Sequence, residues 1–238
     1  MQDIKELIRN VEKYKDTVIQ KKFLSKKNSV CYAIYNNRPV VLKWYAPGFK
    51  TNINTEYQIL RNSPSSINVP TAFDIDEQNN VILMGYIPGT NLCDVINDER
   101  LSANKKKYHI ISLASWFHKF HHYFKKEDKF RIRGDSILRN FILTDRIWGV
   151  DFEESRFGFP QEDVADICSS ILSSFPMFTN EKFLLCKYFI NSYKEYATWD
   201  ILNIEKEIAY SLLKKIQFRP EDEFILRKYS NKIRQRGI

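Results

Sequence analysis

The character of this 238-residue chain changes close to residue 90. Before that point, short runs of β-branched and aromatic residues alternate with turn residues, which is typical of strands. From Leu92 onward, apolar residues recur at helical spacing, most clearly over residues 104–124. Pro88 and Gly89 break regular structure at the junction and make a credible hinge. The sequence therefore predicts an α+β chain with a small antiparallel β-rich N-terminal lobe, a helical C-terminal lobe and a cleft between them.

The expected elements of the first lobe follow from periodicity and turn residues. They are a short amphipathic helix over residues 2–15, strands over 29–35 and 40–45, a helix over 54–61, and strands over 71–76 and 81–86. A polar turn separates the strands of each pair, Asn36–Pro39 in one and Glu77–Asn80 in the other. In the second lobe, residues 131–152 predict a strand–loop–strand interval within otherwise helical sequence.

Composition argues against several classes of protein. Hydrophobic residues make up 43% and charged residues 28%, which is ordinary for a globular protein. No apolar run approaches the roughly 20 residues that span a bilayer, and the N-terminus lacks the charged start and apolar core of a secretion signal. The four cysteines are widely spaced and form no C-x-x-C pair, which disfavours structural zinc and disulfides. We therefore expect a cytoplasmic protein without a membrane span.

The formal net charge of the chain is +8, and much of the excess lies in residues 21–27, in residues 105–107 and after Lys214. A basic excess of this size is compatible with nucleic acid, acidic lipid or phosphorylated ligands as partners. A solvated, lysine-rich surface explains it equally well. The charge therefore leaves a nucleic-acid partner at the basic C-terminus as an open alternative, and the sequence leaves the oligomeric state open.

One stretch of the chain carries residues suited to phosphoryl transfer. Asp135 is followed five residues later by Asn140, and Asp151 stands at the end of the apolar run Ile147–Val150. Phosphoryl transfer needs a carboxylate that orients the nucleophilic hydroxyl or accepts its proton, and oxygen ligands that hold Mg²⁺ against the phosphates. All three side chains offer oxygen, which suits a hard cation. Asp135 is therefore a candidate catalytic residue, and Asn140 and Asp151 are candidate metal ligands.

This stretch resembles the catalytic and metal-binding loops of the protein-kinase-like superfamily. Gly134 before the first Asp, and Phe152 and Glu153 after the second, fit its small-molecule branch of aminoglycoside phosphotransferases, choline kinases and lipopolysaccharide-core sugar kinases. The resemblance implies a bilobal fold, ATP and Mg²⁺ as cofactors, and transfer of the γ-phosphoryl group to a hydroxyl of a sugar, aminoglycoside or choline-like acceptor. It also implies that Asp166 supports the catalytic loop. Glu153 is either an additional carboxylate on the metal side or an exposed neighbour.

The first lobe carries further matches to this resemblance in the same order. Lys43 matches the strand lysine that holds the phosphates of the nucleotide, and Glu56 on the following helix is its natural counter-ion. Met84, Tyr86 and Ile87 fall in the strand whose backbone reads the adenine in these enzymes. The matches run from about residue 20 to about residue 190, and their order carries more weight than any one of them.

Three features depart from the family pattern, one of which is Gly85, standing where an acidic residue is common at the hinge. The catalytic loop begins with Arg133 where the family usually has His, a residue that mainly braces the loop. The phosphate-covering loop, residues 24–29, contains no glycine, so Ser25 or backbone N–H groups are left to meet the phosphate.

The resemblance implies a separate role for each of the two lobes. Residues 1–88 are expected to bind the nucleotide, and residues 89–238 to carry catalysis and bind the acceptor. Two other functions stay open. One is an atypical protein kinase like the RIO kinases or the small kinase of the tRNA threonylcarbamoylation machinery, and the other is a nucleotide-binding pseudokinase.

Overall fold

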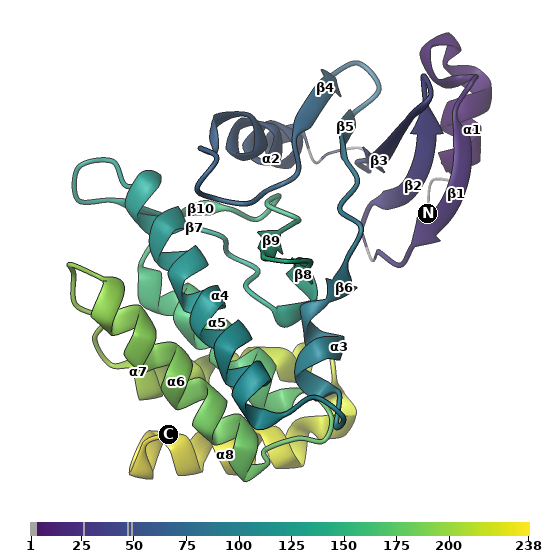
Figure 1. Cartoon of the computed structure of the whole chain (residues 1–238). Helices are drawn as coiled ribbons and strands as arrows, with labels where there is room; N and C mark the ends of the chain where they lie inside the picture. Colours follow the sequence, from purple (N-terminus) through teal and green to yellow (C-terminus); the bar gives the residue numbers. More distant parts are fainter. Residues whose placement is uncertain (1–3, 26, 47, 49) are drawn as a thin grey trace. The chain divides into compact units, whose positions relative to one another are not determined.

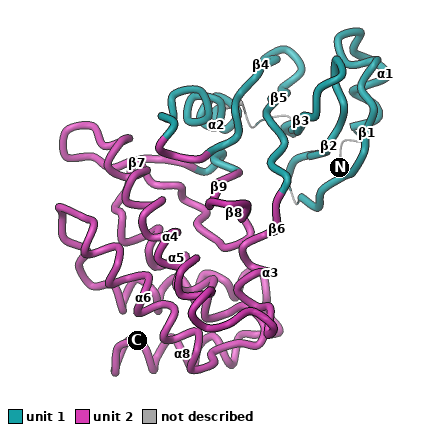
Figure 2. The backbone as a smooth tube through the Cα atoms, in the orientation of Figure 1, with its two compact units in different colours: residues 1–65, 69–88, 151–154 teal, residues 66–68, 89–150, 155–238 magenta. Residues whose placement is uncertain are grey.

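The computed structural model describes residues 4–25, 27–46, 48 and 50–238 and divides into two compact units (Figures 1 and 2). Unit 1 holds residues 1–65, 69–88 and 151–154, and unit 2 holds residues 66–68, 89–150 and 155–238. Unit 1 is rich in strands and unit 2 in helices, so the predicted α+β fold class is confirmed. The division of labour between nucleotide binding and catalysis stays a prediction.

Among the described residues, unit 1 is built on a five-stranded antiparallel sheet. Its elements are α1 (Ile4–Asn10), the 3-10 helix η1 (Glu12–Tyr14), β1 (Val18–Phe23), β2 (Ser29–Tyr35), β3 (Arg38–Trp44), α2 (Lys50–Asn62), β4 (Ala72–Asp76) and β5 (Val81–Gly85). The strands are ordered β1-β2-β3-β5-β4. Since β3 is central, Lys43 pairs with Val30 of β2 on one side and with Ile82 of β5 on the other.

The β2–β3 hairpin turns on two residues rather than the four expected. Asn36 and Asn37 have φ values of 49° and 59°. A two-residue turn with positive φ at both positions matches the twist of paired strands, and Asn tolerates this conformation better than most residues. As a result Arg38 already begins β3, two residues earlier than predicted.

The opening helix is shorter than the range 2–15 predicted for it. It ends at Asn10, because Val11 is extended with φ −113° and ψ 111°, and η1 follows. Residues 2 and 3 lie outside the described part of the chain. The buried side chains of this segment, Ile4, Leu7 and Tyr14, join the apolar cluster of β2, β3 and β5.

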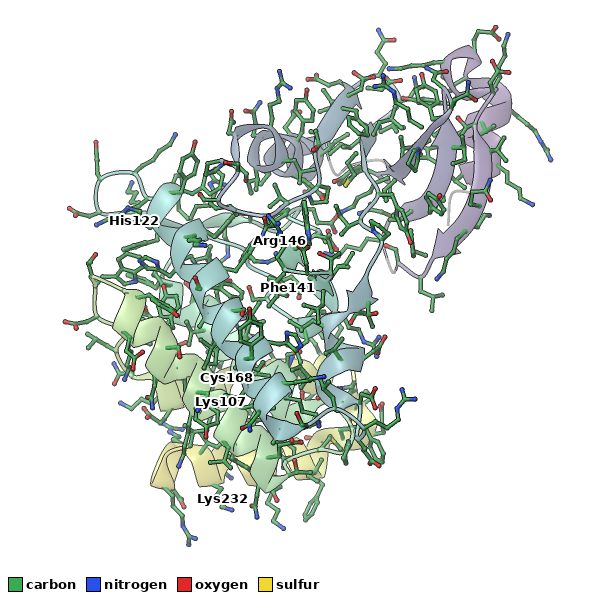
Figure 3. All side chains as sticks on the ribbon, viewed as in Figure 1. Lys107, His122, Phe141, Arg146, Cys168 and Lys232 are labelled. Carbon is green, nitrogen blue, oxygen red and sulfur yellow. The ribbon has the colours of Figure 1, made fainter. Side chains whose placement is uncertain are left out.

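Unit 2 packs its helices around two small sheets. Its elements are β6 (Thr90–Asn91), α3 (Leu92–Asn97), α4 (Ala103–Tyr123), β7 (Phe130–Ile132), η2 (Leu138–Asn140), β8 (Phe141–Leu143), β9 (Ile147–Gly149), β10 (Arg156–Gly158), α5 (Pro160–Ser173), α6 (Asn180–Tyr196), α7 (Ile204–Lys214), η3 (Lys215–Gln217), η4 (Pro220–Asp222) and α8 (Glu223–Arg236). Helix α4 lies alongside α6, and α7 packs against both α5 and α8 (Figure 1). Figure 3 labels Phe141 and Cys168, which are both buried, and Lys232, which is exposed on α8.

Within the described ranges, every helix is too short or too polar to cross a membrane.

Candidate active site

Lys43 is buried in the central strand of unit 1 and is surrounded by three carboxylates of the same unit. Its Nζ lies 2.7 Å from Glu56 Oε2, 2.6 Å from Asp151 Oδ1 and 3.0 Å from Glu153 Oε2. Burial lowers the pKa of the Lys43 ammonium, but Asp151 and Glu56 outweigh this effect and raise the pKa well above its usual value. Lys43 is therefore a fixed positive charge, held on more than one side.

Two polar side chains that the sequence did not single out complete this cluster. The Tyr45 hydroxyl donates a hydrogen bond to Glu56, and the Asn28 amide donates one to Glu153. Both residues flank predicted site positions, Tyr45 two residues after Lys43 and Asn28 in the phosphate-covering loop. Since neither residue type is diagnostic alone, only the fold brings them to the carboxylates.

The loop over residues 24–29 folds back on itself. The Ser25 hydroxyl accepts a hydrogen bond from the backbone N–H of Asn28 at 3.2 Å. Ser25 is therefore engaged with its own loop, and its expected contact with phosphate stays a prediction. Lys26 lies outside the described residues.

The three hinge positions differ in their surroundings. Met84 is buried in β5 and pairs with Val41 of β3. Tyr86 stacks its ring on Tyr32, with 4.1 Å between the ring centroids. Beyond the end of β5, Tyr86 and Ile87 make no backbone hydrogen bond to any described residue. The contact of this backbone with adenine stays a prediction.

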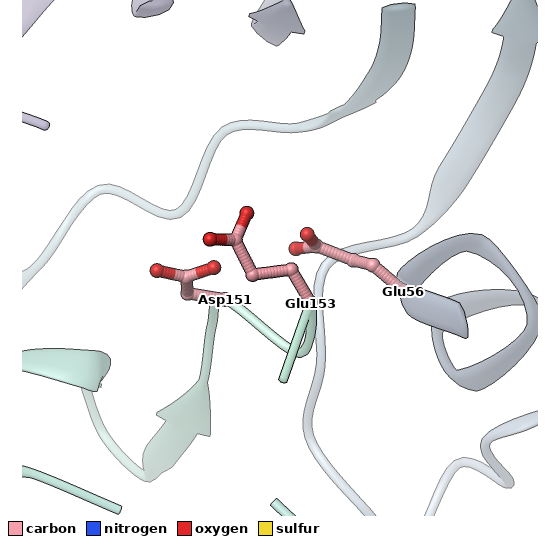
Figure 4. A group of neighbouring side chains, drawn as sticks. All are labelled: Glu56, Asp151 and Glu153. Atoms are coloured by element: carbon pink, nitrogen blue, oxygen red, sulfur yellow. The ribbon is translucent and has the colours of Figure 1, made fainter. Parts of the chain in front are cut away.

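The acidic cluster has the composition of a site for a hard divalent cation (Figure 4). Carboxylate oxygens of Glu56, Asp151 and Glu153 all lie within 4.8 Å of one another. Lys43 is the ammonium that contacts all three, which leaves a formal excess of two negative charges. Burial raises the pKa of Glu153 against the opposing effect of Lys43, and the charge of Asp151 raises it further. A cation of two positive charges with a preference for oxygen, such as Mg²⁺, fits this set.

The backbone conformation of Asp151 sets it apart from the other two carboxylates. Its φ is 65°, in the left-handed region that is uncommon for residues other than glycine. Such strained positions concentrate at functional sites, where the surrounding structure holds them in place. Its side chain is also 40% exposed, against 1% for Glu56 and 10% for Glu153. Asp151 is therefore the carboxylate of this cluster most open to a ligand.

In unit 2 the structure brings Asp135 and Asn140 together. The Asn140 amide nitrogen donates to the Asp135 backbone oxygen at 3.0 Å and to Asp135 Oδ2 at 3.1 Å. Because both partners are acceptors, the amide nitrogen must face them, and Oδ1 of Asn140 remains for a cation. The backbone N–H of Val150 donates to the Asn140 backbone oxygen at 3.0 Å, so the end of β9 is fixed beside η2.

The loop that contains Asp135 is held by Asp163, and its support by Asp166 stays a prediction. Asp163 is fully buried at the start of α5. Its carboxylate accepts hydrogen bonds from Arg133 N at 2.7 Å, from Gly134 N at 3.2 Å and from Ser136 Oγ at 2.8 Å. Asp166, one turn later, instead accepts a hydrogen bond from Ser211 of α7.

A histidine of α4 joins the same network. His121 Nε2 lies 2.9 Å from Asp163 Oδ2, and His121 Nδ1 lies 2.7 Å from the Tyr193 hydroxyl. A carboxylate only accepts, so Nε2 carries the proton that is shared with Asp163. Burial raises the pKa of Asp163, but His121 and the loop donors outweigh burial and bring it below its usual value. The loop is thus anchored on an ionised, fully hydrogen-bonded carboxylate.

Arg133 braces the loop by a route of its own. It is 1% exposed, and its Nη2 donates to the Val150 backbone oxygen at 2.7 Å. Its guanidinium carbon lies 4.6 Å from the Phe141 ring centroid and 5.5 Å from that of Trp116. Arginine stacks on aromatic faces better than lysine does. Gly149 leaves the room for this arrangement, because an added Cβ would lie 2.4 Å from Trp116 and 2.8 Å from Arg133.

Comparison with known proteins gives the same fold. No family model matches the sequence, and no curated protein matches it. Among solved structures, a thermostable mutant of aminoglycoside phosphotransferase APH(4)-Ia, in a ternary complex with ADP and hygromycin B, is 13% identical with a TM-score of 0.66, over 97% of each chain.

Two further structures agree. The gentamicin complex of APH(2")-IIa is 12% identical with a TM-score of 0.62, over 99% of this chain and 97% of that one. A second structure of APH(4)-Ia is 14% identical with a TM-score of 0.63, over 99% of this chain and 98% of that one. Identities this low support a shared fold and nothing finer. The chain therefore has the bilobal, protein-kinase-like fold of the aminoglycoside phosphotransferases.

Proposed function

We propose that this chain is an ATP- and Mg²⁺-dependent phosphotransferase that moves the γ-phosphoryl group to a hydroxyl of a small molecule. The observation that carries the proposal is the buried Lys43, joined at 2.7 Å to Glu56 and at 2.6 Å to Asp151. A lysine placed in this way on the central strand is the part that positions phosphates in kinase-like enzymes. The fold likeness to aminoglycoside phosphotransferases supports the small-molecule branch.

The residues of unit 1 would act on the nucleotide. Lys43, kept in place by Glu56, would contact the phosphates, and the backbone at Tyr86 and Ile87 would meet the adenine. Asp151, Glu153 and Asn140 are the residues that would hold Mg²⁺. When bound, the ion supplies positive charge that offsets the charge on the phosphate oxygens.

Asp135 would act on the acceptor. In the transfer, the acceptor oxygen forms a bond to the γ-phosphorus while the bond from that phosphorus to the β–γ bridging oxygen breaks. The proton of the acceptor hydroxyl passes to the Asp135 carboxylate. Two sets of hydrogen bonds hold this carboxylate in one orientation. Asn140 donates to Asp135 itself, and Asp163 accepts from the backbone N–H groups of Arg133 and Gly134 just before it.

The four cysteines support a reducing, cytoplasmic setting for this reaction. Cys31, Cys93, Cys168 and Cys186 are all free thiols, and all are buried. Chains that work in an oxidising compartment more often pair such residues.

The proposal is tested by measuring ADP formation from Mg²⁺-ATP, alone and with a panel of hydroxylated metabolites, together with nucleotide binding by thermal shift. We expect Asp135→Asn to lower turnover by about 100-fold or more while the nucleotide still binds. Asp151→Asn should abolish the stabilisation that depends on Mg²⁺-nucleotide. Asp145→Asn is the matched control, because Asp145 is exposed on the β8–β9 turn.

Three outcomes would contradict the proposal. If the wild type does not bind Mg²⁺-ATP, the nucleotide site is wrong. If the wild type binds Mg²⁺-ATP but never turns it over, the chain is better described as a pseudokinase. If Asp135→Asn leaves turnover unchanged, Asp135 is not the base.

A further inference from the structure

Lys215 of unit 2 carries an ammonium group that acts on nearby carboxylates over a distance. Lys215 opens η3 directly after α7 and is half-buried. No residue in the described ranges makes a hydrogen bond or an ion pair with its ammonium group. Withdrawing a charge from water without a partner is costly, so such a group usually has a purpose. Its surroundings indicate what that purpose is.

The helix phase relative to Ser211 indicates the direction in which Lys215 faces. One turn earlier, the buried Ser211 of α7 donates to Asp166 Oδ1 at 2.5 Å. The helical backbone continues through Lys215, whose φ and ψ are −68° and −20°. Residues four apart share a helix face. Lys215 therefore faces α5 on the same side as Ser211, next to Asp166.

Asp166 in turn lies along the catalytic loop. On α5, Asp163 holds the start of the loop, and the Ser170 hydroxyl accepts from the Leu138 backbone N–H at 3.0 Å near its end. Asp163, Asp166 and Ser170 are three and four residues apart and so share one face of the helix. Asp166 is therefore placed below the middle of the loop, the stretch that contains Asp135.

The electrostatics agree with this placement. Burial lowers the pKa of Lys215, while the carboxylates of Asp166 and, less strongly, Asp135 raise it. Burial raises the pKa of Asp166 to about 6, and Lys215 and Lys214 oppose that rise. Arg219 is close enough to act on Lys215 as a further positive charge. The ammonium group is thus within electrostatic reach of Asp135, among other cations.

We propose that Lys215 binds an oxyanion of the acceptor, a phosphate or carboxylate substituent near the hydroxyl that Asp135 serves. This inference rests on the proposed function and narrows its acceptor class. A half-buried ammonium attracts an anion more strongly than a fully solvated one does, because screening by water is weaker. An acceptor with an amine beside Lys215 would instead meet a group of like charge. Anionic sugars or polyols are therefore favoured over aminoglycoside-like or choline-like acceptors.

The first test uses inorganic phosphate as the probe, titrated by calorimetry into the whole chain with saturating Mg²⁺-ADP present. We expect Lys215→Gln to weaken phosphate binding by about 10- to 100-fold, the usual effect of losing one charge-assisted contact. Lys215→Arg should retain most of the binding. Lys206→Gln is the matched control, because Lys206 is an exposed lysine of the preceding helix α7. Phosphate binding that is absent in the wild type, or unchanged in Lys215→Gln, overturns the inference, and loss in the Lys206 control marks an adventitious ion only.

The second test compares four sugars of matched size as acceptors for ADP release: glucose 6-phosphate, glucuronate, glucose and glucosamine. We expect the wild type to prefer an anionic sugar, and its two anionic arms separate phosphate from carboxylate recognition. In Lys215→Gln this preference should fall to that for glucose, through KM more than through kcat. A wild type that prefers glucosamine, or a preference that survives the substitution, counts against Lys215. Where none of the four is accepted, the phosphate titration decides.

Failure of the two proposals can be told apart. If the wild type does not bind Mg²⁺-nucleotide, the kinase function is rejected. Phosphate binding that depends on Lys215 could still be measured in that case. Conversely, turnover that depends on Asp135 but is indifferent to acceptor charge keeps the kinase function and rejects the role of Lys215. Melting temperatures of both Lys215 variants confirm that the chain folds.

Discussion

Asp163 offers the sharpest test of how the catalytic loop is held. Replacing it by Asn keeps the size of a fully buried side chain while it removes one negative charge and one acceptor atom. In the wild type, Oδ2 accepts from Arg133 N and His121 Nε2, and Oδ1 accepts from Gly134 N and Ser136 Oγ. An amide presents only one oxygen, so two of these four donors lose their acceptor whichever way it is turned.

The cost of Asp163→Asn follows from those two lost contacts. A hydrogen bond to a charged group contributes about 1.5–3 kcal/mol, so two of them amount to about 3–6 kcal/mol of the free energy of unfolding. The pKa of Asp163 is lowered in the folded chain, so this contribution is present above the unfolded pKa and is lost as pH falls through the folded one. The difference between variant and wild type should therefore shrink in acid.

The assay combines urea unfolding with amide hydrogen exchange at residues 133–136, since exchange reports the loop alone. Asp166→Asn is the matched control on the same helix. Its amide oxygen can still accept from Ser211, and burial raises the pKa of Asp166, so at neutral pH we expect this variant to be at least as stable as the wild type, with no faster exchange in the loop. If Asp163→Asn costs no more than Asp166→Asn and leaves exchange unchanged, Asp163 does not support the loop.

Three further predictions concern single residues. Lys43→Met leaves buried carboxylates without their cation, so it should lower the free energy of unfolding by about 3–5 kcal/mol in urea, with partial recovery on adding Mg²⁺. Gly149→Ala places a Cβ 2.4 Å from Trp116 and should cost about 1–3 kcal/mol, read as a lower melting temperature. Because the pKa of Asp166 is raised to about 6, its contribution to stability should decline as pH rises from about 4 to 6, and Asp166→Asn should remove that decline in a melting series across pH.

Some of the structure follows from residue pattern alone. The hairpin strands, α2 and α4 are found where periodicity and turn residues place them, because each has a regular alternation or a clear apolar face. Lys43 and Glu56 are joined as their charges suggest, since a lysine on an apolar strand needs a counter-ion. Their roles in binding nucleotide stay predictions.

β1 could not be foreseen in the same way. It is an edge strand with mostly exposed side chains, and its segment Val18–Phe23 carries lysines where a half-buried strand would alternate. Lysine on an edge strand discourages pairing with other chains. The same lysines remove the alternation of apolar and polar residues by which a strand is predicted from sequence.

Choosing between Asp163 and Asp166 was also beyond the sequence. The two residues lie three apart on one helix, so both can face the same neighbour. What separates them is where α5 begins, and Pro160 at its first position puts Asp163 in the first turn, beside the loop backbone. Helix phase alone cannot fix the distance to a loop that is 30 residues away in sequence, so the hydrogen bonds of Asp163 to the loop could not be predicted.

Arg133 at the start of the loop and His121 on α4 together do what a single His does in the family pattern. Where the family usually places a bracing His, this chain has Arg133, whose guanidinium is taken up by Val150 and by the rings of Phe141 and Trp116. At the Asp163 carboxylate, it is the backbone N–H of Arg133 that donates a hydrogen bond. His121 supplies the imidazole at that carboxylate instead, from a helix rather than from the loop. An Arg at position 133 is thus compatible with an intact loop, because two side chains share the work of the family's His. Arg133 braces the loop, and His121 makes the hydrogen bond to Asp163.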